Sequence, residues 1–181
     1  AGAPAWQAAI DPGDARFLNP PSMLDAIRSF CVETGQAPPA DAGALARCAL
    51  ESLALSYRQV KDELECLLGR PLCRIRVGGG GGHNGLLNQL TADACELPLE
   101  VGPPESSLLG NACAQLLGLG ALGSLDEARA ILRRSYEARE IEPRGIVPDE
   151  ARARFTRVAR DRSRPNAAPP RAPQGAKVVT S

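Results

Sequence analysis

The 181-residue sequence is poor in aromatic side chains, lysine and histidine. Phenylalanine, tryptophan and tyrosine make up 3% of the chain, there is one histidine, and Lys61 and Lys177 are the only lysines. The formal net charge is zero, which argues against a broad nucleic-acid-binding surface, because such surfaces are strongly basic. No run approaches the roughly 20 apolar residues of a membrane-spanning helix, and the start lacks the pattern of a signal peptide. We therefore expect a cytoplasmic protein with no membrane or nucleic-acid partner.

The cysteine pattern does not fit a metal site. None of the six cysteines forms a CxxC pair, and His83 is the only histidine that could complete a zinc site. Buried free thiols are the default expectation in the cytoplasm. Cys31 and Cys48 fall on consecutive predicted helices and would form a disulfide only if those helices bring them together. The sequence leaves this pairing open.

Five consecutive glycines, Gly78 to Gly82, separate a strand-like run at 72–77 from a helix-like run that begins at Asn84. A glycine loop between a strand and a helix leaves backbone N–H groups unpaired at the positive end of the helix dipole. Such groups bind anions, most often phosphates, and the missing side chains let a ligand approach the backbone closely. Nucleotide binding is therefore the first functional hypothesis.

Two standard phosphate motifs can be compared with this loop. A P-loop needs a lysine directly after its glycines, and neither lysine of the chain lies there. The GxGxxG dinucleotide pattern does match at Gly80, Gly82 and Gly85, and Glu100 lies near the distance of a ribose-binding acid. Any pentaglycine run makes that match easily, so it is weak. A surface loop without a ligand also stays open.

The hydrophobic spacing and the turn residues predict an α/β protein. We expect an irregular segment over residues 1–16 and helices at about 20–35, 41–68, 84–96, 106–118 and 124–135. Strands are expected at 72–77 and 98–101, an arginine-rich helical extension at 144–162, and a disordered tail at 163–181. Two short strands cannot support this many apolar helix faces by themselves. The sequence therefore resembles part of a larger domain.

Several sequence blocks within residues 17–143 resemble the C-terminal part of the FGGY family of carbohydrate kinases. They are CVETGQ at 31–36, ARCALESLALSYR at 46–58, the glycine triplet with Asn84 and LLNQLTADA at 86–94, and GPPESSLLGN at 102–111. The resemblance implies a partial actin/hexokinase/Hsp70-type (ribonuclease H-like) domain, in which helices cover a small sheet. Members of the family bind ATP, with Mg²⁺, and a sugar between two such domains.

The resemblance implies specific binding residues. Gly79, Gly80 and Gly81 match the glycines of the family's adenosine motif, and Asn84 matches its downstream asparagine, so these four are the expected cofactor-binding residues. Asn84 as a plain helix N-cap is the alternative, and both roles are compatible. His83 stands where the family has glutamine, and we expect it to be a loop side chain rather than a catalyst.

The resemblance also sets expectations for activity. It is greatest to members that phosphorylate L-rhamnulose at its 1-hydroxyl with ATP, releasing ADP. The family's catalytic aspartate and most of its sugar contacts belong to the N-terminal domain, so no catalytic residue and no activity are expected of this chain alone. Another ketose or pentulose kinase of the family is one alternative. A non-catalytic remnant or interaction fragment with little or no nucleotide binding is the other.

Overall fold

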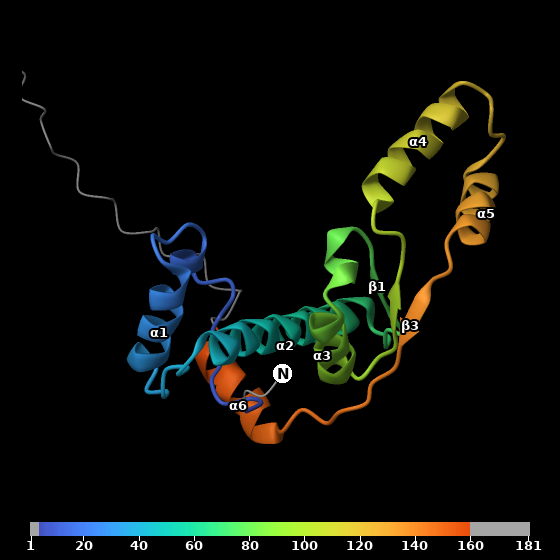
Figure 1. Cartoon of the computed structure of the whole chain (residues 1–181). Coiled ribbons are helices and arrows are strands. Elements are labelled where there is room, and N and C mark those ends of the chain that lie inside the picture. Colours follow the sequence, from blue (N-terminus) through green and yellow to red (C-terminus); the bar gives the residue numbers. More distant parts are fainter. Residues whose placement is uncertain (1–3, 160–181) are drawn as a thin grey trace, which may run out of the picture.

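The computed structural model describes residues 4–159 of the chain and has the α/β character that the sequence predicts (Figure 1). Its elements, in chain order, are a short 3₁₀ turn η1 (Ala15–Phe17), α1 (Met23–Glu33), α2 (Ala42–Leu68), β1 (Ile75–Val77), a second 3₁₀ turn η2 (Gly80–His83), α3 (Gly85–Cys95), β2 (Leu99–Val101), α4 (Ser106–Gly118), α5 (Leu125–Ser135), β3 (Arg139–Ile141) and α6 (Asp149–Val158). The expected tail at 163–181 lies outside the described residues.

The sheet has three strands in the order β1–β2–β3, where the sequence predicts only two. β1 and β2 are parallel, and β2 and β3 are antiparallel, with Leu99 paired to both Ile75 and Ile141. β3 was missed because a run of three residues with two charged side chains has no recognisable apolar alternation. It becomes a strand because β2 offers it a hydrogen-bonding edge.

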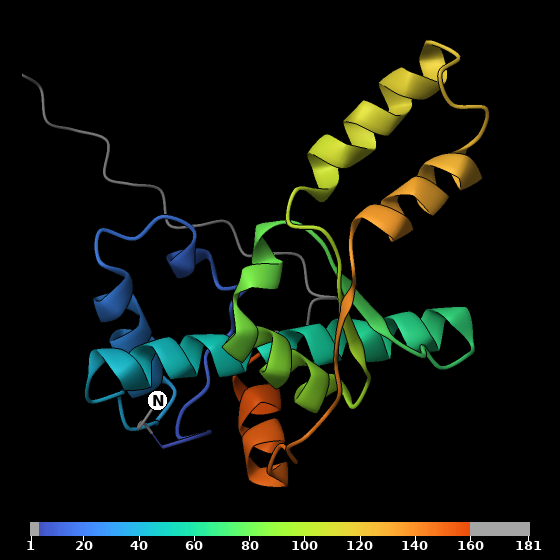
Figure 2. The same ribbon diagram turned by 45° about the vertical axis from the view of Figure 1, so that its right-hand side comes forward.

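Helix α2 is the longest element, and α3 packs along it (Figure 2). The Asp41 carboxylate accepts a hydrogen bond from the Ala44 N–H at 2.8 Å, which caps the first turn as the sequence predicts. Gly69 ends the helix with φ 64°, a conformation that glycine adopts without strain. The Asp41 cap and the Gly69 stop thus set the two ends of α2.

Residues 4–14 form neither helix nor strand, but several of them pack into the core. Ala9 joins a cluster with Leu55 of α2 and Phe155 of α6, and Ile10 joins a second cluster with Phe30 of α1. The tight packing of this irregular segment is a feature that its composition does not show.

Polar side chains of α2 hold this N-terminal segment in place. The buried Glu51 carboxylate accepts a hydrogen bond from the Trp6 N–H and another from Arg47 Nε, each at 2.7 Å. Ser52 Oγ accepts from the Ile10 N–H at 3.0 Å. Burial is the largest influence on Glu51 and raises its pKa, which the two donors oppose. The segment is therefore attached by backbone hydrogen bonds as well as by apolar contact.

Helices α4 and α5 form an arm that extends away from the rest of the molecule (Figures 1 and 2). One half of the predicted capping box opens α5: Ser124 Oγ accepts from the Glu127 N–H at 3.1 Å, whereas Glu127 Oε2 accepts from the N–H of Gly123, one residue before the cap, at 2.8 Å. No residue of α4 is buried. The arm is thus well formed locally but contributes little to the core.

The six cysteines are free thiols, and Cys31 and Cys48 are buried in the same core cluster. Contact with the Cys31 thiol, together with burial, raises the pKa of Cys48, so this thiol stays protonated at neutral pH.

Over residues 4–159, no helix has both the length and the hydrophobicity needed to cross a bilayer.

Candidate nucleotide site at the glycine loop

The glycine loop leaves the carboxyl end of β1, forms the single 3₁₀ turn η2, and enters α3. Gly79 begins that turn with φ 78° and ψ −164°, a backbone conformation that L side chains rarely adopt. Its N–H donates to the Pro103 carbonyl at 3.2 Å, and the Gly82 N–H donates to the Gly79 carbonyl at 3.1 Å. The loop therefore has a defined shape, set by one position that requires glycine.

The inner side of the loop is fixed by an asparagine of α3. Asn88 is 2% exposed, and its Nδ2 donates to the Gly82 carbonyl at 3.0 Å. Asn88 is not among the site residues that the sequence predicts. The signal for it in the sequence was a polar side chain one helical turn after Asn84. Asn88 is a positioning residue, since it reaches the loop backbone from inside the protein.

The five glycines face very different surroundings. A Cβ atom on Gly80 would meet no heavy atom within 4 Å, so this backbone is open to solvent. A Cβ on the buried Gly82 would lie 2.7 Å from Val101 Cγ1, and one on Gly78 would lie 2.7 Å from Ser106 Oγ. Gly78 and Gly82 thus serve packing, whereas Gly80 is available for close approach by a ligand.

A hollow of about 240 Å³ adjoins the loop where the parallel strands β1 and β2 end. Gly79, Gly82 and His83 form one side, and Gly102 and Arg139 form the other. In open α/β sheets, ligands bind outside the carboxyl ends of the strands, which is the position of this hollow. Arg139 is also among the residues that line the hollow, and sequence reasoning missed it together with β3.

Asn84 caps α3: its Oδ1 accepts a hydrogen bond from the Leu87 N–H at 3.0 Å. The side chain is exposed at the same helix end to which the glycine turn leads. Of the four predicted binding residues, Gly79 lines the hollow, while Gly80, Gly81 and Asn84 lie beside it on the adjoining turn. The cap role is seen directly, and the ligand role of all four stays a prediction.

Glu100 does not occupy the place of a ribose-binding acid. Its Oε2 accepts from Arg74 Nη1 at 3.1 Å and from Arg76 Nε at 3.2 Å. The hydrogen bond from Arg74 is the main cause that lowers the pKa of Glu100. Because Glu100 pairs with Arg76 in register, both lie on the sheet face opposite Val77 and Val101. This geometry gives no support to the GxGxxG match.

The loop fits an anionic nucleotide in its backbone and its charge. Gly80 lets a ligand approach, the first N–H groups of a helical turn have no acceptor within the turn, and the basic residue Arg139 is among those that line the hollow. No group of three or more His, Cys, Asp or Glu side chains among residues 4–159 is arranged to hold a metal ion. Phosphate binding at this loop stays a prediction.

Comparisons with known proteins identify a family that this chain resembles. The model for "FGGY family of carbohydrate kinases, C-terminal domain" matches residues 1–119. A rhamnulokinase of Pectobacterium carotovorum is 46% identical over 141 residues, which are 78% of this chain and 28% of that protein. A rhamnulokinase of Yersinia pestis is 43% identical over 140 residues, covering 77% of this chain and 29% of that protein. This chain therefore spans less than a third of the length of these relatives.

A solved structure is also similar to the chain. The crystal structure of a xylulose kinase from Rhodospirillum rubrum is 24% identical, with a TM-score of 0.45, over 71% of this chain and 25% of that one.

Proposed function

The chain belongs to the FGGY family of carbohydrate kinases, and on that basis we propose that it is the C-terminal, nucleotide-binding part of an ATP-dependent kinase for L-rhamnulose. The observation that carries the proposal is the 46% identity to a rhamnulokinase over 78% of the chain. The open backbone at Gly80, beside the hollow at the strand ends, supports the nucleotide assignment. The parent reaction would give L-rhamnulose 1-phosphate and ADP in the cytoplasm.

In this proposal the chain holds one side of the nucleotide. Backbone N–H groups of the turn that Gly79 opens donate to a phosphate or ribose oxygen, and Asn84 lies near the adenosine. Arg139 offsets negative charge at the rim of the hollow, and Asn88 keeps the loop backbone in position from inside. Bound ATP, with its Mg²⁺, supplies the phosphoryl group for transfer. The residues that bind the sugar, and the base that accepts its proton, lie in the remainder of the kinase. Phosphoryl transfer needs these groups and the nucleotide assembled together.

The experiment measures ADP formation with L-rhamnulose and ATP. The chain alone should give no sugar-dependent ADP above background. The same chain joined to the N-terminal remainder of the Pectobacterium carotovorum rhamnulokinase should give turnover that requires both substrates. Turnover by the chain alone, or none by a folded joined protein, would contradict the proposal. D-xylulose in place of L-rhamnulose tests the choice of sugar.

A further inference from the structure

A second hollow, the α6 hollow, lies where the N-terminal segment, the end of α1 and α6 meet. Its volume is about 650 Å³, and it shares no residue with the hollow at the glycine loop. Volumes of roughly 300–1,000 Å³ are typical of sites for small molecules. Its lining comes from Gln7 of the N-terminal segment, from residues 34–37 after α1, and from Arg154, Arg157 and Val158 of α6.

The wall after α1 is held in one shape by its own hydrogen bonds. Gly35, with φ 71°, follows the last turn of α1, and the Gln36 N–H donates to the Cys31 carbonyl at 2.8 Å. Gln36 Nε2 donates to the Ala9 carbonyl and Gln36 Oε1 accepts from the Ala9 N–H, each at 2.8 Å. This wall is therefore formed before any ligand binds, and it carries no formal charge.

The wall that α6 contributes is basic. Arg154 and Arg157 are three residues apart, so they lie on the same face of the helix. Arg154 Nη1 donates to the Trp6 carbonyl, which directs this guanidinium toward the N-terminal segment. Phe155 between them is buried in the core with Leu55 of α2, which fixes the position of the helix. Two guanidinium groups thus reach the hollow from one well-anchored element.

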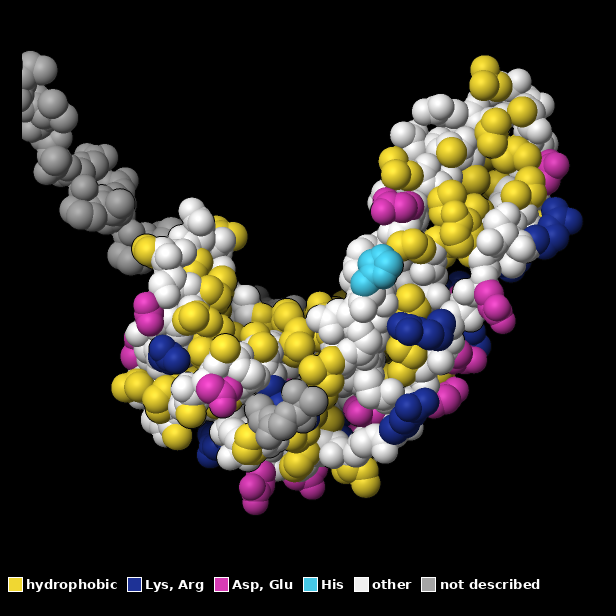
Figure 3. All heavy atoms as spheres, viewed as in Figure 1, with side chains coloured by type: hydrophobic (Ala, Val, Ile, Leu, Met, Phe, Trp, Pro, Cys, Tyr) yellow, Lys and Arg dark blue, Asp and Glu magenta, His cyan; other side chains and the backbone are white. Residues whose placement is uncertain are grey.

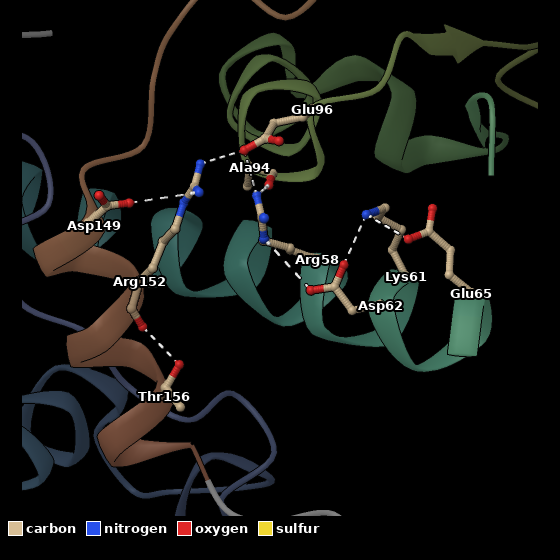
Figure 4. A network of polar contacts seen from close by, with 9 residues as sticks. All are labelled: Arg58, Lys61, Asp62, Glu65, Ala94, Glu96, Asp149, Arg152 and Thr156. Atoms are coloured by element: carbon tan, nitrogen blue, oxygen red, sulfur yellow. Dashed lines mark hydrogen bonds and ion pairs between the residues drawn. The ribbon is translucent and has the colours of Figure 1, made fainter. Parts of the chain in front are cut away.

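These two guanidinium groups have no counter-charge in the described part of the chain. No acidic residue is among the described residues that line the α6 hollow. Within residues 4–159 neither Arg154 nor Arg157 forms an ion pair, whereas Arg152 of the same helix lies 2.6 Å from Glu96 (Figure 4). A guanidinium has five N–H donors, and Arg154 uses one of them on Trp6. The hollow therefore offers two positive charges with donors to spare.

The lining of the α6 hollow suits a phosphate ester. Arginine binds phosphate and carboxylate groups through paired N–H···O hydrogen bonds. A phosphate ester carries nearly two negative charges at neutral pH, which matches two guanidinium groups, whereas a carboxylate carries one. Gln7 Nε2 donates to the Ala5 carbonyl at 3.1 Å, and Gln7 Oε1 has no donor among residues 4–159. That oxygen can accept a hydrogen bond from a hydroxyl group of the same ligand.

We propose that the α6 hollow is a second ligand site, which binds a small phosphate ester that also carries hydroxyl groups. Arg154 and Arg157 bind the phosphate, and Gln7 accepts a hydrogen bond from a hydroxyl. Binding here is independent of the proposed function, because the site shares no residue with the hollow at the glycine loop. The bound ester joins the N-terminal segment to α6 and therefore stabilises the folded chain.

The test uses the 181-residue chain and three probes: glycerol 3-phosphate, inorganic phosphate and glycerol. Phosphorus and proton NMR of each probe, at increasing protein concentration and low salt, measure its dissociation constant. Low salt is needed because mobile ions screen exposed charges. We expect a dissociation constant of about 1 mM or lower for glycerol 3-phosphate, binding about threefold or more weaker for inorganic phosphate, and no binding of glycerol.

Four substitutions separate this site from general attraction of anions. Arg157→Gln should weaken the binding of glycerol 3-phosphate about tenfold or more, and its exposed position makes a folding defect avoidable. Arg134→Gln is the matched control, because Arg134 is exposed in the last turn of α5, as Arg157 is in that of α6. Arg134→Gln and Gly80→Val should each leave binding within about threefold. Gln7→Ala should weaken the binding of glycerol 3-phosphate and leave that of inorganic phosphate unchanged.

Absence of glycerol 3-phosphate binding by the wild-type chain would overturn the proposal. Equal losses in Arg157→Gln and Arg134→Gln would show that overall charge attracts the ester, and would also overturn it. Loss of binding in Gly80→Val would assign the ester to the glycine loop instead. Inorganic phosphate bound as tightly as the ester, with no effect of Gln7→Ala, would overturn the choice of a ligand with hydroxyl groups. Circular dichroism spectra check that each variant is folded.

Discussion

At the scale of single residues, the glycine loop divides into positions that serve the fold and positions that serve a ligand. Gly82 is buried against Val101, and Gly79 needs its positive φ, so both are required for the loop to exist. Gly80 is constrained by neither packing nor backbone conformation within the chain. A glycine that the fold does not require is the position where a ligand effect can be separated from a folding effect.

We predict that Gly80→Val, in the chain joined to the kinase remainder, raises the Michaelis constant for ATP by at least about tenfold and changes that for sugar far less. A Cβ there would meet no protein atom within 4 Å, so we expect the substitution to obstruct mainly what approaches from outside. Gly110→Val on α4 is the control, since it also enters open space, away from the loop. Equal kinetics for the two variants would count against a nucleotide at Gly80.

The same substitution at Gly82 should act through stability instead. A Cβ there would lie 2.7 Å from Val101 Cγ1, so Gly82→Val forces the loop or β2 to move. We expect a loss of about 1–3 kcal/mol in unfolding free energy, as for other overpacked core sites. Urea denaturation of the Gly82→Val and Gly80→Val proteins measures the difference. A smaller loss for Gly82→Val than for Gly80→Val would contradict the packing seen around this loop.

At the scale of elements, Glu96 connects three helices (Figure 4). It ends α3 with φ 56°, and its Oε1 lies 2.9 Å from Arg58 Nη1 of α2 and 2.6 Å from Arg152 Nη2 of α6. Arg58 also donates to the Ala94 carbonyl at 2.6 Å. Phe155 of α6 is buried in the same core cluster as Leu55 of α2. The helix that follows β3 is thus attached by both apolar contact and ion pairs.

We predict that Glu96→Gln destabilises the chain slightly near neutral pH and not in acid. The hydrogen bond from Arg58 is the main cause that lowers the pKa of Glu96, with Arg152 contributing. A lowered carboxyl pKa gives stability that is complete above the unfolded value of about 4.5 and is lost as pH falls through the folded value. Because Glu96 is 57% exposed, the effect should stay below about 1 kcal/mol.

The measurement is the difference in urea unfolding free energy between the wild type and Glu96→Gln at about pH 6 and about pH 3. Glu150→Gln, at an exposed position of α6, is the control. A difference that grows toward acid would show that the ion pairs do not stabilise this attachment.

At the scale of the whole molecule, apolar side chains remain on the outside of several elements (Figure 3). Leu67 on α2, Leu108 on α4, Leu119 after it and Leu125 on α5 are each at least 60% exposed. The formal net charge of the chain is zero, so repulsion between copies does not oppose association. The arm in particular therefore exposes apolar surface.

We predict that the chain by itself associates or melts over a broad temperature range at neutral pH. Exposed apolar surface and the free edge of β1 both favour contact between copies. Light scattering after size exclusion and a thermal melt by circular dichroism measure the two properties. A monomer with one sharp, reversible transition would contradict this prediction. Addition of the kinase remainder should reduce the association.

Interactions between residues that are close in sequence determine where most of the helices begin and end. Asp41, Asn84 and Ser124 each cap the helix that follows them, and Gly69 ends α2, because caps and stops act within one turn of the chain. The pentaglycine run likewise identified the strand-to-helix turn. These features were predictable from the sequence, since each depends on a hydrogen bond or a backbone conformation within a few residues.

The surroundings of that turn depend instead on segments that are far apart in sequence. β3 is a strand because it pairs with β2, about 40 residues earlier, and it thereby brings Arg139 to the hollow. Gly82 differs from Gly80 because Val101, about 20 residues later, lies behind it. Such contacts arise only when the elements pack in three dimensions, so the local pattern of the sequence does not contain them.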